Sequence, residues 1–173
     1  MPDKWVFPGG RIDRSDYVAP YFTDLAPDVA TNLAATARLK RQDGEKLARA
    51  LARTAIRETF EETGLVIGRL NNGRLIADLA GLDYIARAIT PPARHKRFDA
   101  RFLLADAEHL AALDPTDSRE LGEVAWFTLK DCRTLDLPTV TRAVLDVVDT
   151  HLSGQAYERP FWRWTRTMAN SAL

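Results

Sequence analysis

The spacing of apolar positions along this chain changes several times between helical and strand-like periods. Between about residues 45 and 63, apolar residues recur at helical spacing and leave three glutamates on another face, which predicts a long helix. A helical pattern also covers residues 28–40, and residues 41–44 are expected to break it at a glycine. Residues 139–151 carry a third helical pattern, with Gly154 beyond its end.

Shorter segments that alternate, or that are rich in β-branched and aromatic residues, predict strands. The expected strands are residues 4–7, 65–67, 83–89, 97–104 and 123–127. Residues 75–79 are interpreted as a short helix or turn and residues 131–133 as a helical turn, whereas the basic, aromatic segment 159–166 receives no assignment. Strands interleaved with helices indicate an α/β fold, with a single domain over residues 1–173.

Composition and charge exclude several classes of function. A chain of 173 residues with 46% hydrophobic residues can bury one ordinary core. Its 24 basic residues balance its 24 acidic residues, so the overall charge gives no reason to expect a nucleic-acid polymer as partner. No apolar run reaches a membrane-spanning length, and Cys132, the single cysteine, excludes an intrachain disulfide. We expect a cytoplasmic protein with no membrane partner.

Residues 57–65, Arg-Glu-Thr-Phe-Glu-Glu-Thr-Gly-Leu, are the most informative segment of the chain. Glu58, Glu61 and Glu62 stand at i, i+3 and i+4, so they lie on the same face of a helix. Like charges so close together repel each other unless a cation lies among them, and Mg²⁺ or Mn²⁺ prefers such hard oxygen ligands. Arg57 is close enough to pair with Glu61. The alternative is an ordinary solvated helix face.

Together with the turn Phe7-Pro8-Gly9-Gly10, this segment resembles the Nudix box, the motif of enzymes that cleave a nucleoside diphosphate linked to another group. The second half matches at every fixed charged and glycine position, although Thr59 stands where an aliphatic residue is usual. The resemblance covers about residues 4–152 and implies a Nudix-type α/β/α sandwich with a mixed sheet. It also implies Mg²⁺ or Mn²⁺, with these ligands: Glu58, Glu61, Glu62 and a backbone carbonyl at Gly10 or Gly9.

The sequence departs from the pattern inside the box. Asp16 stands where the pattern has a glutamate, and 40 residues separate it from Arg57 where the pattern has seven. Glu45 is the other candidate for the missing glutamate. The inserted segment, about residues 17–45, is helical in composition and is interpreted as a helical hairpin beside the site. Interrupted boxes of this kind resemble a branch of the family that includes coenzyme A diphosphatases.

The second departure lies at the start of the chain. Nudix domains carry one or two strands before the Pro-Gly-Gly turn, whereas about seven residues precede it here. We therefore expect a sheet without its usual N-terminal strands and with an exposed edge. One interpretation is that Met1 is an internal methionine of a longer protein. The other is that a partner chain, such as the second copy of a homodimer, supplies the edge.

Hydrolysis of a phosphoanhydride requires neutralised phosphoryl oxygens and a water placed in line. The resemblance implies that Arg57 orients a glutamate, and we expect Glu58 to be the general base, with Glu120 and Glu123 as alternatives. Substrate phosphates are expected to bind a basic segment after the strand expected at residues 83–89. The alternative is that this segment is only a charged loop exposed to water, which explains its composition equally well. The residues assigned to substrate binding are Arg94, Lys96 and Arg97, and Phe98 is interpreted as a core residue rather than a stacking platform.

The predicted function is a metal-dependent pyrophosphohydrolase that acts on a small molecule linked to a nucleoside diphosphate, coenzyme A or its acyl esters being candidates. Two alternatives remain. The first is a non-catalytic nucleotide-binding or regulatory module, against which the retention of all three glutamates argues. The second is an incomplete domain without activity of its own.

Overall fold

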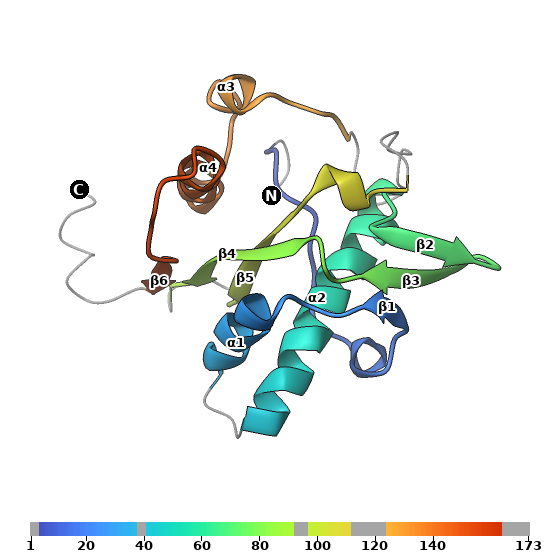
Figure 1. Cartoon of the computed structure of the whole chain (residues 1–173). Helices are drawn as coiled ribbons and strands as arrows, with labels where there is room; N and C mark the ends of the chain where they lie inside the picture. The colour runs from blue at the N-terminus through green and yellow to red at the C-terminus, as the bar shows by residue number, and fades with distance from the viewer. Residues whose placement is uncertain (1–3, 38–40, 92–96, 112–123, 164–173) are drawn as a thin grey trace.

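The computed structural model describes residues 4–37, 41–91, 97–111 and 124–163 (Figure 1). In chain order, its elements are the 3₁₀ helix η1 (Arg14–Tyr17), β1 (Tyr21–Thr23), α1 (Pro27–Ala35), α2 (Arg41–Thr63), β2 (Gly68–Asn71), β3 (Arg74–Asp78), β4 (Leu82–Ile89), β5 (Asp99–Ala105), the 3₁₀ helix η2 (Ala107–His109), α3 (Leu129–Cys132), α4 (Thr139–Leu152) and β6 (Phe161–Arg163). No helix within these ranges is both long enough and apolar enough to cross a membrane.

The strands form two small mixed sheets. One has the order β1-β3-β2, with β1 parallel to β3 and β2 antiparallel to it. The turn between β2 and β3 places Asn72 and Gly73 at φ 49° and 75°, the left-handed conformation that suits a tight hairpin. The other has the order β5-β4-β6, with β5 antiparallel and β6 parallel to β4.

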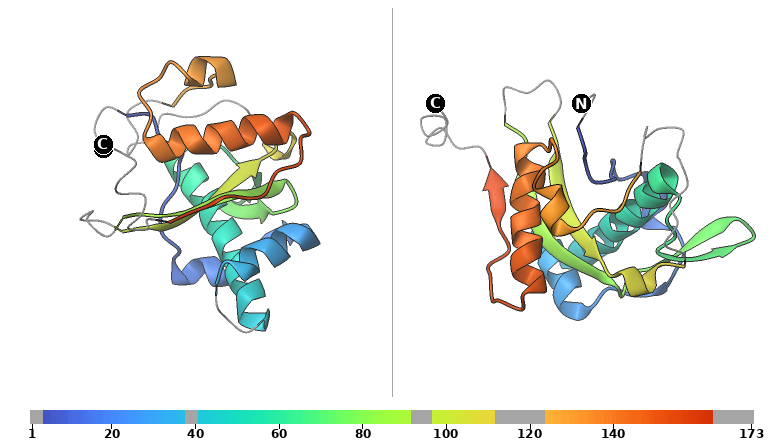
Figure 2. Two further views of the ribbon diagram at one scale, coloured as in Figure 1. Left: turned by 90° about the vertical axis from the view of Figure 1, so that its left-hand side faces the viewer. Right: turned by 90° about the horizontal axis from the view of Figure 1, so that it is seen from above.

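Helices cover both faces of the sheet that contains β4. Figure 2 shows α4 on one side of this sheet and α1 on the other. Ile85 and Ala86 of β4 pack with Val144 and Val148 of α4, whereas the larger apolar core joins α1, α2, β3 and the other face of β4. Burial of apolar side chains on both sides of β4 holds the layers together. The predicted α/β class, with helices on both faces of a mixed sheet, is confirmed.

Helix α2 carries the glutamates, and its buried face fixes their direction. Ala48, Ala52 and Ile56 are fully buried against the core, which leaves the glutamate face outside. The predicted helix over residues 45–63 is confirmed, but the expected break at residues 41–44 is wrong because α2 begins at Arg41. A Cβ on Gly44 would lie 3.2 Å from the Cβ of Ala34, so this glycine admits the close approach of α1.

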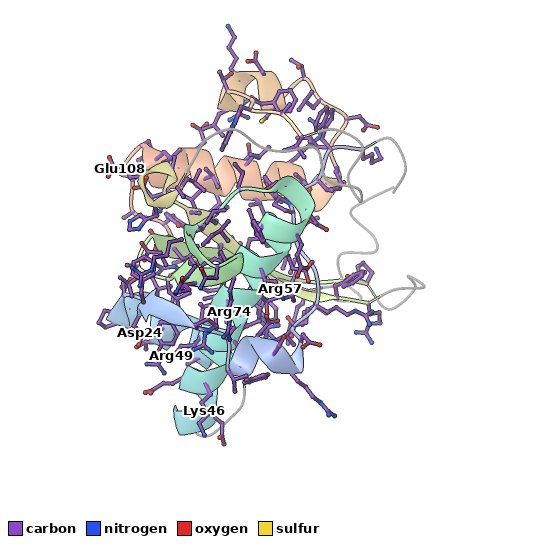
Figure 3. The ribbon with its side chains drawn as sticks, turned by 90° about the vertical axis from the view of Figure 1, so that its right-hand side faces the viewer. Asp24, Lys46, Arg49, Arg57, Arg74 and Glu108 are labelled. Carbon is purple, nitrogen blue, oxygen red and sulfur yellow. The ribbon has the colours of Figure 1, made fainter. Side chains whose placement is uncertain are left out.

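An ion pair fastens the start of α2 to the segment before α1. Arg49 donates from Nε and Nη2 to both carboxylate oxygens of Asp24, at 2.8 to 3.0 Å (Figure 3). Planar two-point pairing of this kind fixes orientation as well as distance. The pair therefore orients α2 relative to the inserted segment.

Several predicted elements are confirmed with shifted bounds. The expected strands at 83–89 and 97–104 are β4 and β5, and the helix expected at 139–151 is α4. The helix expected at 28–40 is α1, which ends at Ala35. The helical turn expected at 131–133 overlaps α3.

Other strand predictions are wrong. Residues 4–7 form no strand, because Trp5 and Phe7 pack edge-on against Phe127 and Phe102 instead of joining a sheet. In the strand expected at 65–67, only Ile67 pairs, in an isolated bridge with Leu110. In the strand expected at 123–127, the described residues 124–127 form no strand. Conversely, the segment 75–79 is largely strand β3 rather than a helix or turn.

The inserted segment and the chain's last described residues both contribute strands. The inserted segment holds β1, α1 and the first residues of α2, so the two packed helices expected there are preceded by a strand that was not expected. Residues 161–163, which received no assignment from the sequence, form β6 and occupy the edge of β4. β6 thereby covers β4 along residues 87–89, and the exposed edge expected from the short N-terminal segment stays a prediction.

Candidate active site

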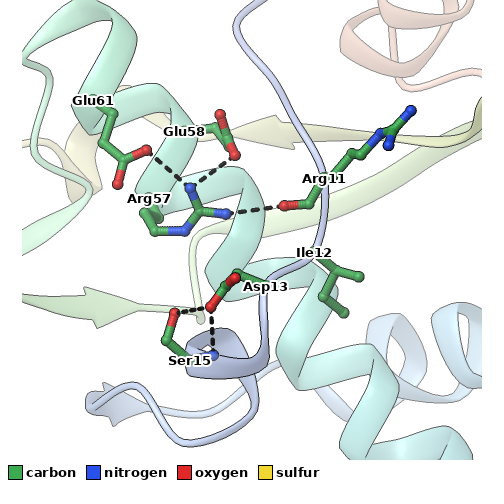
Figure 4. A pocket seen from close by; sticks show the side chains of 7 residues that line it. All are labelled: Arg11, Ile12, Asp13, Ser15, Arg57, Glu58 and Glu61. Carbon is green, nitrogen blue, oxygen red and sulfur yellow. Dashed lines mark hydrogen bonds and ion pairs between the residues drawn. The ribbon is translucent and has the colours of Figure 1, made fainter.

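Arg57 is the centre of a hydrogen-bond network near the end of α2. Its Nε and Nη2 donate to the two carboxylate oxygens of Asp16 at 2.9 and 3.0 Å. Its Nη1 donates to Glu58 at 2.8 Å and to Glu61 at 2.9 Å, and Nη2 also donates to the carbonyl of Arg11 at 3.1 Å (Figure 4). The Asp16 carboxylate raises the pKa of Arg57, so the guanidinium is charged throughout the ordinary pH range.

Asp16 is the buried anchor of this network, with 1% of its surface exposed. Its carboxylate accepts hydrogen bonds from the Asp13 amide and the Thr54 hydroxyl, both at 2.8 Å, in addition to Arg57. Burial alone would raise the pKa of Asp16, but the bonds from Arg57, Asp13 and Thr54 outweigh it and hold the pKa below its ordinary value. Asp16 is therefore ionised despite its burial.

The structure decides between the two candidates for the missing glutamate. Asp16 contacts Arg57 directly, because η1 brings it against α2. Glu45 lies twelve residues before Arg57 on the same helix, which is about 18 Å along the axis. Asp16, rather than Glu45, is the acidic partner of Arg57.

Local structure fixes the position of Asp16. The Asp13 side chain accepts the Ser15 amide and the Asp16 side chain accepts the Asp13 amide, which together form a capping box on η1. On the other side, Arg53 donates from Nη1 to the Asp16 carbonyl at 2.9 Å, and its guanidinium lies 4.5 Å from the centre of the Tyr21 ring. The short loop is thus held from both sides.

The glycine turn lies directly against the glutamates. The Gly9 amide donates to Oε2 of Glu62 at 2.8 Å. A Cβ on Gly10 would lie 2.3 Å from the Glu58 carboxylate, so any side chain there would displace it. The turn predicted at residues 8–10 and the helix face predicted at residues 58–62 therefore form one site.

An open pocket of about 390 Å³ lies over this network (Figure 4). Its lining residues are Arg11, Ile12, Asp13, Ser15, Arg57, Glu58 and Glu61. Arg57, Glu58 and Glu61, all predicted from the sequence, are therefore brought together at one surface. The polar lining suits a charged ligand.

The oxygen atoms of these carboxylates are of the type that a hard cation binds, although the side chains do not converge on a single position. Within the described ranges, no group of three or more acidic, histidine or cysteine side chains is placed to hold a metal ion. The reason is that Nη1 of Arg57 lies between Glu58 and Glu61, and Glu62 turns to the Gly9 amide. Two carboxylates that already bind one cationic group provide the oxygen donors that Mg²⁺ or Mn²⁺ prefers.

The predicted substrate-binding residues are only partly described. Arg94 and Lys96, and the alternative bases Glu120 and Glu123, lie outside the described residues. Arg97 is exposed at the start of the β5 segment. Phe98 is 46% exposed, so its interpretation as a core residue is wrong.

Sequence reasoning missed four pocket residues, Ile12, Asp13, Ser15 and Arg11, and Arg11 is the cationic one among them. It lines the pocket, and its guanidinium carbon lies 5.6 Å from the centre of the Phe98 ring. The signal was available, because Arg11 directly follows the two glycines and any residue there must lie beside the glutamates.

Comparison with known proteins identifies the class. The sequence model of the NUDIX domain matches residues 43–147, more than half of the chain, and the chain therefore belongs to the Nudix family. It is a Nudix-type hydrolase, and a pyrophosphohydrolase in the general sense of that family. The match begins at residue 43, near the end of the inserted segment, and so does not include Gly10 or Asp16, whose place at the site is given by the structure.

A solved structure supports the assignment over a longer range. The crystal structure of a NUDIX hydrolase from Alicyclobacillus acidocaldarius is similar to this chain with a TM-score of 0.60 and 26% sequence identity. The similarity covers 86% of this chain and 78% of that one. No curated protein matches the sequence.

Proposed function

We propose that this chain hydrolyses a phosphoanhydride bond in a small molecule linked to a nucleoside diphosphate, and that it requires a divalent cation. The observation that carries the proposal is the Asp16–Arg57 pair, which extends to Glu58 and Glu61 at the pocket. The buried, ionised Asp16 holds an arginine that pairs with Glu58, 15% exposed, and Glu61, 51% exposed, and this orients the two glutamates for a ligand. A simple solvated helix face needs no such support.

The residues divide into ligands and supports. Glu58, Glu61 and Glu62 would hold Mg²⁺ or Mn²⁺ once their side chains turn from Arg57 and the Gly9 amide toward one point, with the carbonyl of Gly10 as a further oxygen. A bound divalent cation would neutralise phosphoryl oxygens and lower the pKa of a coordinated water. Arg57 positions the glutamates rather than the substrate, because Asp16, Glu58, Glu61 and the Arg11 carbonyl occupy its donors.

We assign Glu58 as the general base that accepts a proton from the attacking water. Its carboxylate lies against Gly10 and lines the pocket, and one oxygen accepts from Arg57. The second oxygen is free of that bond to accept a proton. Replacement by glutamine should abolish this step while it preserves the side chain's shape.

The substrate class follows from the interrupted box and from charge. Coenzyme A or an acyl ester of it is the first candidate, since boxes interrupted by such a segment resemble those of coenzyme A diphosphatases. Arg97, with Arg94 and Lys96 beyond the described residues, would add positive charge for the phosphates. A cytoplasmic location and a homodimer stay predictions.

The test is hydrolysis of coenzyme A, ADP-ribose, NADH, diadenosine polyphosphates and nucleoside triphosphates with Mg²⁺ or Mn²⁺, with products identified by mass. We expect metal-dependent cleavage of one class, lost in the Glu61→Gln, Glu62→Gln double variant. Glu158→Gln, at an exposed glutamate before β6, is the matched control and should retain full activity. Absence of cleavage by folded protein would refute the proposal in favour of a binding module.

A further inference from the structure

The Phe98 ring is exposed although its backbone is fixed. The Phe98 amide donates to the Thr90 hydroxyl at 3.0 Å, and the Thr90 amide donates to the Phe98 carbonyl at 2.9 Å. These bonds close the end of the β4–β5 pair. Fraying of the strand end is therefore not the reason why the ring is exposed. A phenylalanine that leaves nearly half its surface in water forgoes part of the free energy of burial.

Arg11 joins this ring to the candidate active site. Its side chain extends away from Arg57 (Figure 4), and its guanidinium lies over the Phe98 ring. In the described part of the chain, no carboxylate pairs with the Arg11 guanidinium, whereas Arg57 pairs with three. The pocket thus has one cation committed to its glutamates and another that lies between the pocket and an aromatic surface.

Two other exposed phenylalanines show what is particular to Phe98. Phe22 is 45% exposed beneath Arg69, and Phe161 is 47% exposed beneath Arg87. None of the three phenylalanines lines the pocket, and of their three arginine partners only Arg11 does. A cation over an exposed ring is therefore common on this surface, but Arg11 with Phe98 is the pair whose arginine lines the pocket.

We infer that Phe98 and Arg11 form the subsite for the nucleobase of the substrate. Aromatic rings and arginine guanidinium planes both stack on nucleobases, and this stacking tolerates any base because every base has a π face. A ligand whose phosphates occupy the pocket would place its adjoining nucleoside next to Arg11. This inference rests on the proposed function for the orientation of the ligand.

Equilibrium binding separates the base from the phosphate. We would measure calorimetric binding of AMP, GMP, UMP and ribose 5-phosphate to the full chain with Mg²⁺, because the nucleotides differ from ribose 5-phosphate by the base. Stacking of one base should make at least one nucleotide bind roughly fivefold or more tightly than ribose 5-phosphate. Phe98→Ala should remove this preference, and Phe98→Trp should retain it.

Phe22→Ala is the matched control, since it removes an equally exposed ring beneath an arginine and should leave the preference unchanged. Phe98→Leu provides a second test if Phe98→Ala does not fold, because it keeps an apolar side chain without the π face. Nucleotide preference that persists in Phe98→Ala or in Phe98→Leu would overturn the inference. Equal binding of nucleotides and ribose 5-phosphate by the wild-type protein would overturn it too.

The two proposals fail in different ways. Hydrolysis without any dependence of base preference on Phe98 would leave the proposed function standing and remove the subsite. Base preference that depends on Phe98, without hydrolysis of any substrate, would keep the subsite and remove the hydrolytic function.

Discussion

Two buried aspartates, Asp16 and Asp78, show how similar local chemistry serves different purposes in this molecule. They are 1% and 8% exposed, and hydrogen bonds hold the pKa of each below its ordinary value although burial alone would raise it. Asp78 accepts from the Thr23 hydroxyl, the Ala80 amide and Nδ1 of His109, the last at 2.7 Å. Each is an ionised carboxylate satisfied by several donors.

The difference lies in where the partners lead. Arg57 pairs with Asp16 and also with Glu58 and Glu61 at the pocket, so it connects the buried carboxylate to the surface. Its guanidinium is always protonated. His109 ends the Asp78 network at a ring that packs against Gly81, and neither residue lines the pocket. A buried, ionised carboxylate therefore does not itself mark a reaction site. The connection from its partner to an open surface does.

Removal of each carboxylate should produce the largest contrast. Asp16→Ala leaves a charged guanidinium beside a buried cavity, and we expect a loss of about 3 kcal/mol in the free energy of unfolding. Activity of the folded protein should fall by roughly 10- to 100-fold, as for residues that position metal ligands. Asp78→Ala should cost only about 1–2 kcal/mol, because His109 can lose its proton, and should keep kcat/KM.

Denaturant unfolding and steady-state kinetics on the same preparations would measure both effects. Equal loss of activity in Asp16→Ala and Asp78→Ala, after correction for the unfolded fraction, would show that the two networks do not differ as we describe.

Two glycines sharpen the comparison, because each lies against one network. A Cβ on Gly10 would lie 2.3 Å from the Glu58 carboxylate, and a Cβ on Gly81 would lie 2.3 Å from the His109 ring. Gly10→Ala should lower kcat/KM by about tenfold with little effect on stability, because the Glu58 carboxylate is the end of a flexible side chain and can move aside. Gly81→Ala should cost about 1–2 kcal/mol in stability, since it crowds a ring bound to buried Asp78, and should keep activity.

The informative result is that Gly10→Ala lowers activity and keeps stability whereas Gly81→Ala lowers stability and keeps activity. Thermal melts and kcat/KM measured on both variants would detect this. Loss of activity in Gly81→Ala, or unchanged activity in Gly10→Ala, would contradict the assignment of one glycine to the site and the other to the fold.

The free energy of unfolding should fall in acid as the Asp16 carboxylate is protonated. The pKa of Asp16 is lowered on folding, so its contribution is present above the unfolded value of about 3.9 and is lost as the pH falls through the lower folded pKa. Asp16→Asn should therefore flatten the fall in stability below about pH 4. Urea midpoints measured between pH 2 and pH 6 on both proteins, roughly the range in which aspartate titrates, would show this.

A smaller effect is expected near neutral pH from His109. The hydrogen bond to Asp78, and the charge of Asp78, raise the pKa of His109 above its ordinary 6.5. Its contribution is complete below that value and is lost as the pH rises through the folded pKa. His109→Ala should be less stable than the wild type below about pH 6, and the difference should shrink above that raised pKa. A constant difference across this range would refute the pairing.

The sequence predicts helix α2 well because its signals are local. The spacing of Glu58, Glu61 and Glu62 and the apolar face of α2 both follow from helical periodicity. The partner of Arg57 depends instead on how η1 folds back, which residue counting cannot give, and Asp16 and Glu45 thus remained alternatives. Gly44 was misread for a similar reason, since contact with α1 overrides its weak helical propensity.

The errors among the strands have a common physical cause. Trp5 and Phe7 have strand propensity, but their rings find partners on Phe127 and Phe102, far away in the sequence. The segment forming β3 pairs with β1 and β2, and β6 pairs with β4 from a distance of about seventy residues. Short strands of this kind are specified by their partners more than by their own composition.

The most direct test of the account is the affinity for Mn²⁺ or Mg²⁺ of the wild-type protein, Asp16→Asn and Asp78→Asn, measured by calorimetry at neutral pH on folded protein. The account holds that Asp16 acts through Arg57 to place the metal-binding glutamates. It predicts that Asp16→Asn binds the metal roughly 10- to 100-fold more weakly and that Asp78→Asn binds it as tightly as the wild type. Unchanged affinity in Asp16→Asn, or equal weakening in both variants, would contradict it.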